Sequence, residues 1–306
     1  MPALLDLTTG RPLTRGRLAL YPLFSDAPPA APYVAGPAAA TAGVLAVREV
    51  DSGATVPELL VETAGEVPVL LAEGETLLGA KQNRTLNVTV LLAPGARTRI
   101  PVSCVEAGRW GAPQRTARSG RHAPMQVRLD KTRSVADNVR GGRGRYSDQA
   151  AVWSTVAGFE VRAGAPSETH ALEDVHRARS VDVSRLVGGT RPLDGQRGVV
   201  VAIDGVVRAV DVFDRPETLA LYWNSLMAGY ALDAVVDGDR PAVDAVDGAV
   251  GGADVDGFLA RLAAADVSVT PGVGLGEEVH VRGDDVVATG LRWDGTLVHL
   301  AAFALA

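Results

Sequence analysis

The sequence has a single cysteine, Cys104, so no internal disulfide can form. The disulfide frameworks of small secreted proteins are therefore excluded. The start of the chain lacks the basic and apolar regions of a secretory signal. No apolar run approaches the length of a membrane span. We therefore expect a cytoplasmic protein without a membrane partner.

Lysine is also nearly absent. Of the 30 basic residues, only Lys81 and Lys131 are lysine, and the rest are arginine. With so much Ala, Gly, Val and Asp, this bias indicates a GC-rich bacterial genome, so a single arginine carries less functional weight than usual. Lys81 is notable because coding bias alone would have placed an arginine there. The net charge of −6 argues against a general nucleic-acid binder.

Motifs for the common cofactors are missing. The sequence contains no Walker loop, no dinucleotide-binding glycine pattern and no metal-binding helix pair. Of the five histidines, only His280 and His299 lie on predicted strands of the same terminal sheet, and two histidines alone do not define a metal site. The cofactor is therefore unknown from the sequence, and no metal site is expected.

Short apolar segments separated by turn residues are abundant, and hydrophobic residues make up 47% of the chain. In the first hundred residues these segments follow one another closely, with turns at Glu73–Gly74 and Pro94–Gly95. In the last third, Asp204–Gly205 and Asp294–Gly295 predict hairpins, and a helix is predicted from Asp214 to about Val235. The fold class is therefore α+β, β-rich, with mostly antiparallel sheets (a sandwich or meander) and a few helices in the C-terminal half.

We treat residues 1–306 as a single domain that can be divided by composition. Residues 1–110 form a β-rich part, residues 111–146 a basic loop segment, and residues 147–306 an α+β part. In the last part, Ser147–Val161 is predicted to be a helix with Ser147 as its N-cap.

The basic segment is rich in arginine and has only two acidic residues, Asp130 and Asp137. Its two ends, Gly111–His122 and Gly141–Arg145, are predicted to be loops. Residues 204–256 are strongly acidic. If they lie against the basic segment, both biases are explained without an external partner.

The first candidate site lies at the end of a predicted strand. Residues two apart on a strand share a face, so Cys104 and Glu106 point the same way. Gly108 lets the backbone turn, which leaves Arg109 to face a carboxylate or phosphate and Trp110 to offer a stacking surface. A thiol, a carboxylate, a guanidinium and an indole together suit a small anionic ligand with an aromatic ring.

Cys104 is not our candidate nucleophile. A single cysteine on a strand is more often a small buried apolar residue, and the adjacent Glu106 would raise the pKa of its thiol. Glu106 is the better candidate for acid–base work. The alternative for Glu106, equally open, is a structural salt bridge to Arg109 or Arg99.

The second candidate site is a run of four polar residues, Lys81, Gln82, Asn83 and Arg84, inside an otherwise apolar strand region. A plain turn usually has Gly, Asp or Pro at its centre, and this one has none. A lysine and an arginine beside two amides can bind phosphate or carboxylate oxygens and the edge of a base. A solvated hairpin turn is the alternative.

These two segments, GAKQNR and PVSCVEAGRW, resemble the ARPP-1 domain, the "ARG and rhodanese-phosphatase-superfamily-associated protein" domain. The resemblance extends over most of the chain, from Leu20–Leu23 to His299 and Phe303. The family is named for gene neighbours, ADP-ribosylglycohydrolases and rhodanese-like phosphatases. The resemblance therefore implies a role in ADP-ribose or NAD-linked nucleotide metabolism, but it carries no catalytic assignment.

We thus expect an intracellular protein that binds or processes an anionic, nucleotide-like metabolite at a site formed by residues 79–84 and 101–110. Glu106 is the expected catalytic residue. The expected ligand-binding residues are Lys81, Gln82, Asn83, Arg84, Arg109 and Trp110. The expected partners are a small anionic metabolite such as ADP-ribose and a protein of ADP-ribose metabolism. The alternatives are a non-catalytic scaffold and a nucleic-acid-binding module that uses residues 110–146, which the acidic net charge disfavours.

Overall fold

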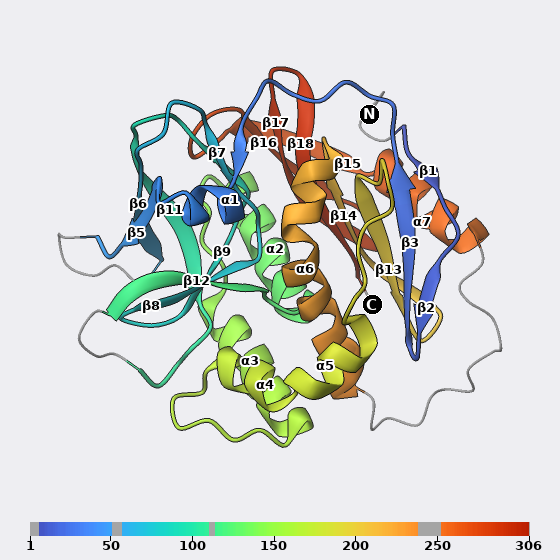
Figure 1. Ribbon diagram of the computed structural model, residues 1–306, viewed down its shortest axis with the longest axis horizontal. Coiled ribbons are helices and arrows are strands. Elements are labelled where there is room, and N and C mark those ends of the chain that lie inside the picture. The colour runs from blue at the N-terminus through green and yellow to red at the C-terminus, as the bar shows by residue number, and fades with distance from the viewer. Residues whose placement is uncertain (1–5, 51–56, 110–113, 238–251, 306) are drawn as a thin grey trace.

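Two β regions at opposite ends of the molecule are separated by helices α2 (Met125–Arg140) and α6 (Pro216–Val236) (Figure 1). This computed structural model describes residues 6–50, 57–109, 114–237 and 252–305. The sheets within these ranges are mostly antiparallel, and strand residues outnumber helical ones. The predicted β-rich α+β fold class is therefore confirmed.

The larger sheet joins the first strands of the chain to the last ones. In the described part of the chain its order is β1-β3-β13-β14-β18-β17-β16-β15, with β2 paired to β3, and every pairing is antiparallel. Its strands are β1 (Thr8–Thr9), β2 (Leu13–Arg15), β3 (Leu18–Phe24), β13 (Gly198–Ile203), β14 (Val206–Phe213), β15 (Asp266–Pro271), β16 (Glu277–Arg282), β17 (Val286–Trp293) and β18 (Thr296–Ala304). The N-terminal and C-terminal thirds of the sequence therefore share one sheet.

The smaller β region carries both segments singled out from the sequence. Its six-stranded sheet has the order β12-β8-β9-β11-β6-β5, and a three-stranded sheet, β10-β7-β4, lies beside it. The strands are β4 (Val34–Ala35), β5 (Leu45–Arg48), β6 (Glu58–Thr63), β7 (Val69–Leu71), β8 (Glu75–Ala80), β9 (Arg84–Leu86), β10 (Val90–Leu92), β11 (Arg97–Cys104) and β12 (Gln114–His122). The β4–β7 pair is parallel.

Two hairpins of the large sheet follow from their turn residues. Asp204 and Gly205 have φ values of 52° and 75°, and Asp294 and Gly295 have 51° and 75°. Asp tolerates the left-handed region and Gly adopts it without a steric penalty, so an Asp-Gly pair fits a two-residue turn between antiparallel strands. Both predicted hairpins are confirmed.

The other helices are α1 (Gly36–Thr41), α3 (Gln149–Ala163), α4 (Leu172–Ala178), α5 (Ser180–Val187) and α7 (Gly252–Ala264). Helix α3 lies close to its predicted position, but its N-cap is Asp148, not Ser147. The Asp148 carboxylate accepts the backbone N–H groups of Ala150 and Ala151 at 3.0 and 3.1 Å. The negative charge of Asp148 suits the helix N-terminus, and the Ser147 hydroxyl instead contacts the Ser103 hydroxyl.

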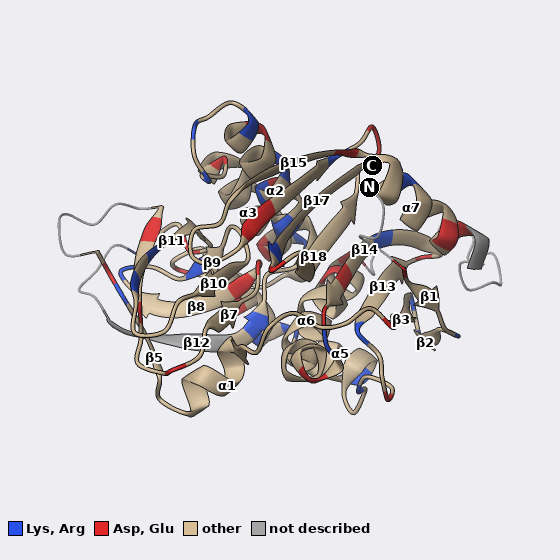
Figure 2. Ribbon diagram, turned by 90° about the horizontal axis from the view of Figure 1, so that it is seen from above, with Lys and Arg blue, Asp and Glu red and all other residues tan. Residues whose placement is uncertain are grey.

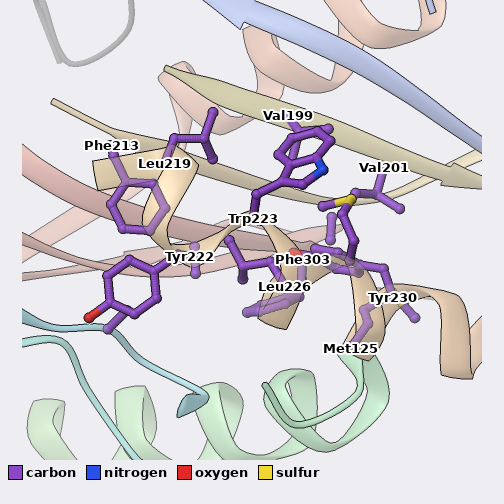
Figure 3. Close-up of a cluster of buried hydrophobic side chains, with 14 of the residues drawn as sticks. Met125, Val199, Val201, Phe213, Leu219, Tyr222, Trp223, Leu226, Tyr230 and Phe303 are labelled. Atoms are coloured by element: carbon purple, nitrogen blue, oxygen red, sulfur yellow. The ribbon is translucent and has the colours of Figure 1, made fainter. Parts of the chain in front are cut away.

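Helices cover both faces of the large sheet. Helix α7 packs Val255, Phe258 and Leu262 against one face. Helix α6 is buried almost all round and packs against the other face, where aromatic rings fill the space (Figure 3). A helix that is apolar on every side requires neighbours on every side. Helix α6 therefore lies in the middle of the molecule, between the two β regions.

The basic segment is not a loop over most of its length. Residues 114–122 form strand β12, which pairs with β8, and residues 125–140 form helix α2. The prediction of a loop over Gly111–His122 is therefore wrong for Gln114–His122. Arginine and glycine have little intrinsic strand preference, but pairing with a neighbouring strand outweighs local propensity. Residues 111–113 lie outside the described ranges.

Basic and acidic parts of the chain meet inside the molecule, as the sequence composition suggests. Arg128 of the basic segment pairs with Asp211, which lies in the acidic stretch, and both side chains are buried. In Figure 2, basic and acidic segments are interspersed over the ribbon. Among the helices that the structure describes, none is long and apolar enough to cross a membrane.

Candidate functional site

The two segments singled out from the sequence lie side by side. Strand β8 ends at Ala80 and β9 begins at Arg84, so Lys81, Gln82 and Asn83 form the connection between them. Strand β9 pairs with β11, which places Arg84 directly opposite Cys104. Residues on opposite strands in register share a face of the sheet, so these two side chains are neighbours.

Arg84 is fully buried, and most of its hydrogen-bonding capacity is unused. Its Nη1 donates to the side-chain oxygen of Gln82 at 3.3 Å. Its Nε and Nη2 are buried and have no hydrogen-bond partner, and no described carboxylate lies within ion-pair distance. A buried charge without a partner costs several kcal/mol, roughly, unless a counter-ion reaches it. Arg84 is therefore the strongest candidate anion-binding group in this part of the protein.

Glu106 and Arg109 form a salt bridge close by, as one of the two alternatives from the sequence proposed. Glu106 Oε1 accepts from Arg109 Nε and from the Thr169 hydroxyl, both at 2.9 Å. Its Oε2 accepts from Arg109 Nη2 at 2.8 Å and from the backbone N–H of Asn83 at 2.9 Å. Burial would raise the pKa of Glu106, but these four hydrogen bonds lower it below its ordinary value. A carboxylate held in this way is a weak base.

Arg109 also holds a strained piece of backbone. Its guanidinium donates to the carbonyl oxygens of Gly79 and Ala80, each at 3.2 Å, and to Asn83 Oδ1 at 3.2 Å. Gly79 and Ala80 have φ values of 97° and 49°. A non-glycine residue in the left-handed region costs about 1–3 kcal/mol and persists only where its surroundings fix it. We call Glu106, Arg109 and the backbone they hold the Arg109 clamp.

Gly108 is required by a close contact, not by a turn. Its N–H donates to the Thr169 carbonyl at 2.7 Å, and a Cβ on Gly108 would lie 2.9 Å from the Thr169 Cα. Any side chain there would push the two backbones apart. Thr169 also donates to Glu106, so the absence of a side chain at Gly108 keeps the Arg109 clamp in place.

The remaining predicted ligand-binding residues occupy different environments. Gln82 is buried, and its amide donates weakly to the Ala107 carbonyl at 3.4 Å. Lys81 is half-buried, and its backbone N–H donates to Glu49 Oε1 at 2.7 Å. Trp110 lies outside the described residues, so its stacking role stays a prediction. No three His, Cys, Asp or Glu side chains of the described ranges are grouped so as to hold a metal ion.

Cys104 is buried beside Arg84, and its thiol is protonated at neutral pH. Burial raises the pKa of Cys104 to about 11, and the positive charge of Arg84 offsets this only in part. The thiolate is the reactive form of cysteine. Cys104 is therefore a poor nucleophile in this structure, which agrees with the interpretation from the sequence.

We expect native Cys104 to resist alkylation. Iodoacetamide should label the folded protein very slowly at pH 7.5, because both burial and the raised pKa suppress the thiolate. The rate should increase about tenfold per pH unit towards pH 11 while the fold persists. Labelling followed by mass spectrometry measures this, with urea-unfolded protein as the control. Rapid stoichiometric labelling of the folded protein at pH 7.5 would contradict the buried position of the thiol.

A second polar cluster, which the sequence analysis missed, is buried between the two β regions. We call it the buried charge network. Its side chains come from the β7–β8 connection and from α2, β14, α6 and β18, and all are at most 1% exposed. They are Glu73, Arg128, Lys131, Asp211, Tyr230 and His299. These residues are far apart in the sequence, and the fold alone brings them together.

Arg128 is the centre of this network. Its Nη1 and Nη2 donate to the two oxygens of Asp211 at 3.0 and 2.9 Å, and its Nε donates to Glu73 at 3.0 Å. Burial would raise the pKa of Asp211, but the charge of Arg128 and a hydrogen bond from His299 hold it well below its ordinary value. Asp211 is therefore a carboxylate at neutral pH.

Lys131 and His299 complete the network. Lys131 Nζ donates to Glu73 and to the backbone carbonyl of Leu86, and burial lowers the pKa of Lys131 to about 8. His299 contacts Asp211 at 3.2 Å through Nε2 and the Thr89 hydroxyl at 2.6 Å through Nδ1. The cations Arg128 and Lys131 thus balance the carboxylates of Glu73 and Asp211. We interpret the network as structural, whereas Arg84 has no carboxylate partner among the described residues.

One signal in the sequence points to this network. The rarity of lysine makes Lys131 as notable as Lys81, because coding bias favours arginine at both positions. An ammonium group is compact enough to reach a carboxylate and a backbone carbonyl in a closed space, where a planar guanidinium demands more room. The other members carry no comparable signal in the sequence.

The chain matches the sequence profile of a known family. The profile of the ARPP-1 family, described as the ARG and Rhodanese-Phosphatase-superfamily-associated Protein domain, matches residues 6–303. No curated protein and no solved structure gives a significant match. The family description associates the chain with ARG and rhodanese-phosphatase proteins and suggests a role in ADP-ribose-related metabolism. Because the match covers nearly all of its 306 residues, the chain belongs to the ARPP-1 family.

Proposed function

We propose that this protein binds an anionic, nucleotide-like metabolite of ADP-ribose-related metabolism, with Arg84 as the main anion-binding residue. The observation that carries the proposal is the buried Arg84 guanidinium, whose Nε and Nη2 have no partner. Its neighbour Cys104 is neutral and does not compensate the charge. A phosphate oxygen would satisfy both donors and neutralise the guanidinium.

The other residues of the site have supporting roles in this proposal. Glu106 and Arg109 position the Lys81–Arg84 connection through the backbone of Gly79, Ala80 and Asn83. Glu106 is therefore assigned as a positioning residue, because each of its two carboxylate oxygens already accepts two hydrogen bonds, from Arg109, Thr169 and the Asn83 N–H. Lys81, Gln82 and Asn83 are proposed to contact the ligand from the connection itself, and Trp110 to stack on its base.

The basic segment supports this proposal over a nucleic-acid-binding role. Arg128 and Lys131 are fully buried and paired with carboxylates, and Arg145 is paired with the buried Glu278. Nucleic-acid binding depends on cations that can reach phosphates along a surface. Several of the charges that made the segment look basic are therefore used within the fold.

The proposal is tested by the stability of the wild-type protein and of Arg84→Met in the presence of ADP-ribose. A large excess of ligand should stabilise the wild-type protein by about 2–3 kcal/mol. Arg84→Met should show no such effect. The free variant should be more stable than the free wild-type protein by about 1–3 kcal/mol, because an uncompensated buried charge is removed. Urea denaturation with and without ADP-ribose, NAD or AMP measures both effects.

Arg97→Met is the matched control. Arg97 lies on the same strand as Cys104, but its side chain is 65% exposed and pairs with Glu62 on the surface. This variant should keep the full response to ADP-ribose. The proposal fails if none of the three nucleotides stabilises the wild-type protein, or if Arg84→Met responds as strongly as wild type.

A further inference from the structure

Glu49 is a second unsatisfied group near Arg84, and neither candidate segment of the sequence contains it. It follows strand β5, and its Oε1 accepts the backbone N–H of Lys81 at 2.7 Å. Its Oε2 is buried and has no hydrogen-bond partner. The hydrogen bond to Lys81 fixes this carboxylate against the connection that leads into Arg84.

Glu49 and Arg84 act on the same thiol. Burial is the main reason that the pKa of Cys104 is raised; Arg84 lowers it through its charge, and Glu49 and Glu106 raise it. Both charged groups therefore lie within electrostatic range of Cys104. Arg84 and Glu49 form no ion pair with each other. Instead, Arg84 donates to the Gln82 side chain, and Glu49 accepts from the backbone N–H of Lys81. The fold thus keeps apart two opposite charges that would satisfy each other by pairing.

The hydrogen-bonding needs of the two groups differ. Arg84 presents two free donors, which call for the oxygens of an anion. Glu49 presents one free acceptor, which calls for an O–H or N–H donor and repels an anion. A simple phosphate provides acceptors alone. A ligand that matches both groups carries an anionic group and, close to it, a hydroxyl.

We infer that the site takes a phosphorylated sugar, with its phosphate on Arg84 and a sugar hydroxyl donating to Glu49 Oε2. This inference rests on the proposed function and specifies which part of a nucleotide the site holds. Carboxylates are well suited to ribose hydroxyls, because an ionised oxygen accepts a stronger hydrogen bond than a neutral one.

The experiment compares two ligands by calorimetry, ribose 5-phosphate and tetrahydrofurfuryl phosphate, which has the same ring and phosphate but no ring hydroxyls. The wild-type protein should bind ribose 5-phosphate about ten- to a hundredfold more tightly, as expected for a hydrogen bond to a buried charge. Glu49→Gln should lose most of the preference for ribose 5-phosphate. The amide oxygen of the glutamine can still accept the Lys81 N–H, but its NH2 group replaces Oε2 and cannot accept a bond from the sugar hydroxyl. Arg84→Met should weaken both ligands.

Glu62→Gln is the control, because Glu62 lies on the neighbouring strand β6 and pairs with the exposed Arg48 and Arg97. It should keep the preference for the hydroxylated ligand. Equal binding of both phosphates to the wild-type protein would overturn the inference without any variant, as would an unchanged preference in folded Glu49→Gln. In either case binding that still depends on Arg84 leaves the proposed function standing. If neither phosphate nor ADP-ribose binds, the proposed function itself has failed.

Discussion

Arg128→Met is expected to lower the free energy of unfolding by about 3–5 kcal/mol, the usual cost of breaking a buried ion pair by removing one partner. Arg128 donates to both Glu73 and Asp211, and all three side chains are at most 1% exposed. Without the guanidinium, Lys131 alone faces two buried carboxylates. This is the largest single effect on stability that we expect. It is a large fraction of the total, because a native domain is stable by only about 5–15 kcal/mol.

Urea denaturation followed by circular dichroism measures the effect. Arg177→Met is the control, because Arg177 is 73% exposed and its pair with Asp174 is a surface contact worth at most about 1 kcal/mol. Adding Asp211→Asn to Arg128→Met should recover part of the lost stability, since one uncompensated charge is then removed. The proposed role of Arg128 is wrong if the single variant is as stable as the Arg177 control.

Arg109→Met is expected to cost about 2–4 kcal/mol at neutral pH. The substitution leaves the buried Glu106 without its cation and releases the carbonyl oxygens of Gly79 and Ala80. We place the cost below that of Arg128→Met because the Arg109 side chain is 20% exposed and water can replace part of its interactions.

The cost should depend on pH in a defined direction. The pKa of Glu106 is lowered in the folded protein, so its contribution to stability is present above the unfolded pKa of about 4.3 and is lost as the pH falls through the folded value. The difference between wild type and Arg109→Met should therefore be largest near pH 7 and shrink below about pH 4. Arg99→Met, whose side chain is 57% exposed, is the control. A difference that grows on acidification would contradict the role of the clamp.

The two polar clusters illustrate different uses of buried charge. In the buried charge network the charges balance and the members bridge the two β regions, so the network fixes how these regions sit together. At Arg84 the charge is left open, which costs stability in the free protein. Open charges of this kind are characteristic of binding sites, where the ligand supplies the missing partner.

Features that depend on residues close together in the sequence were predictable, and features that depend on distant segments were not. The hairpins at Asp204–Gly205 and Asp294–Gly295 were predictable because their turn residues act locally. The salt bridge between Glu106 and Arg109 was a foreseeable alternative for the same reason, since the two residues are three apart. Strand β12 was not predictable, because its arginine-rich sequence has little strand preference and only pairing with β8 makes it a strand.

The fold class, the two hairpins and the two candidate segments follow from the residues themselves. The environment of each site residue depends on how the whole chain packs. The tertiary structure buried Arg84 with two unpartnered donors, placed Glu49 against the backbone of Lys81, and joined Arg109 to the strained backbone at Ala80. It also built a charge network from residues as distant as Glu73 and His299. The physical reason is that turns and strand patterns depend on neighbouring residues, whereas the burial and pairing of a charge depend on every segment that packs around it.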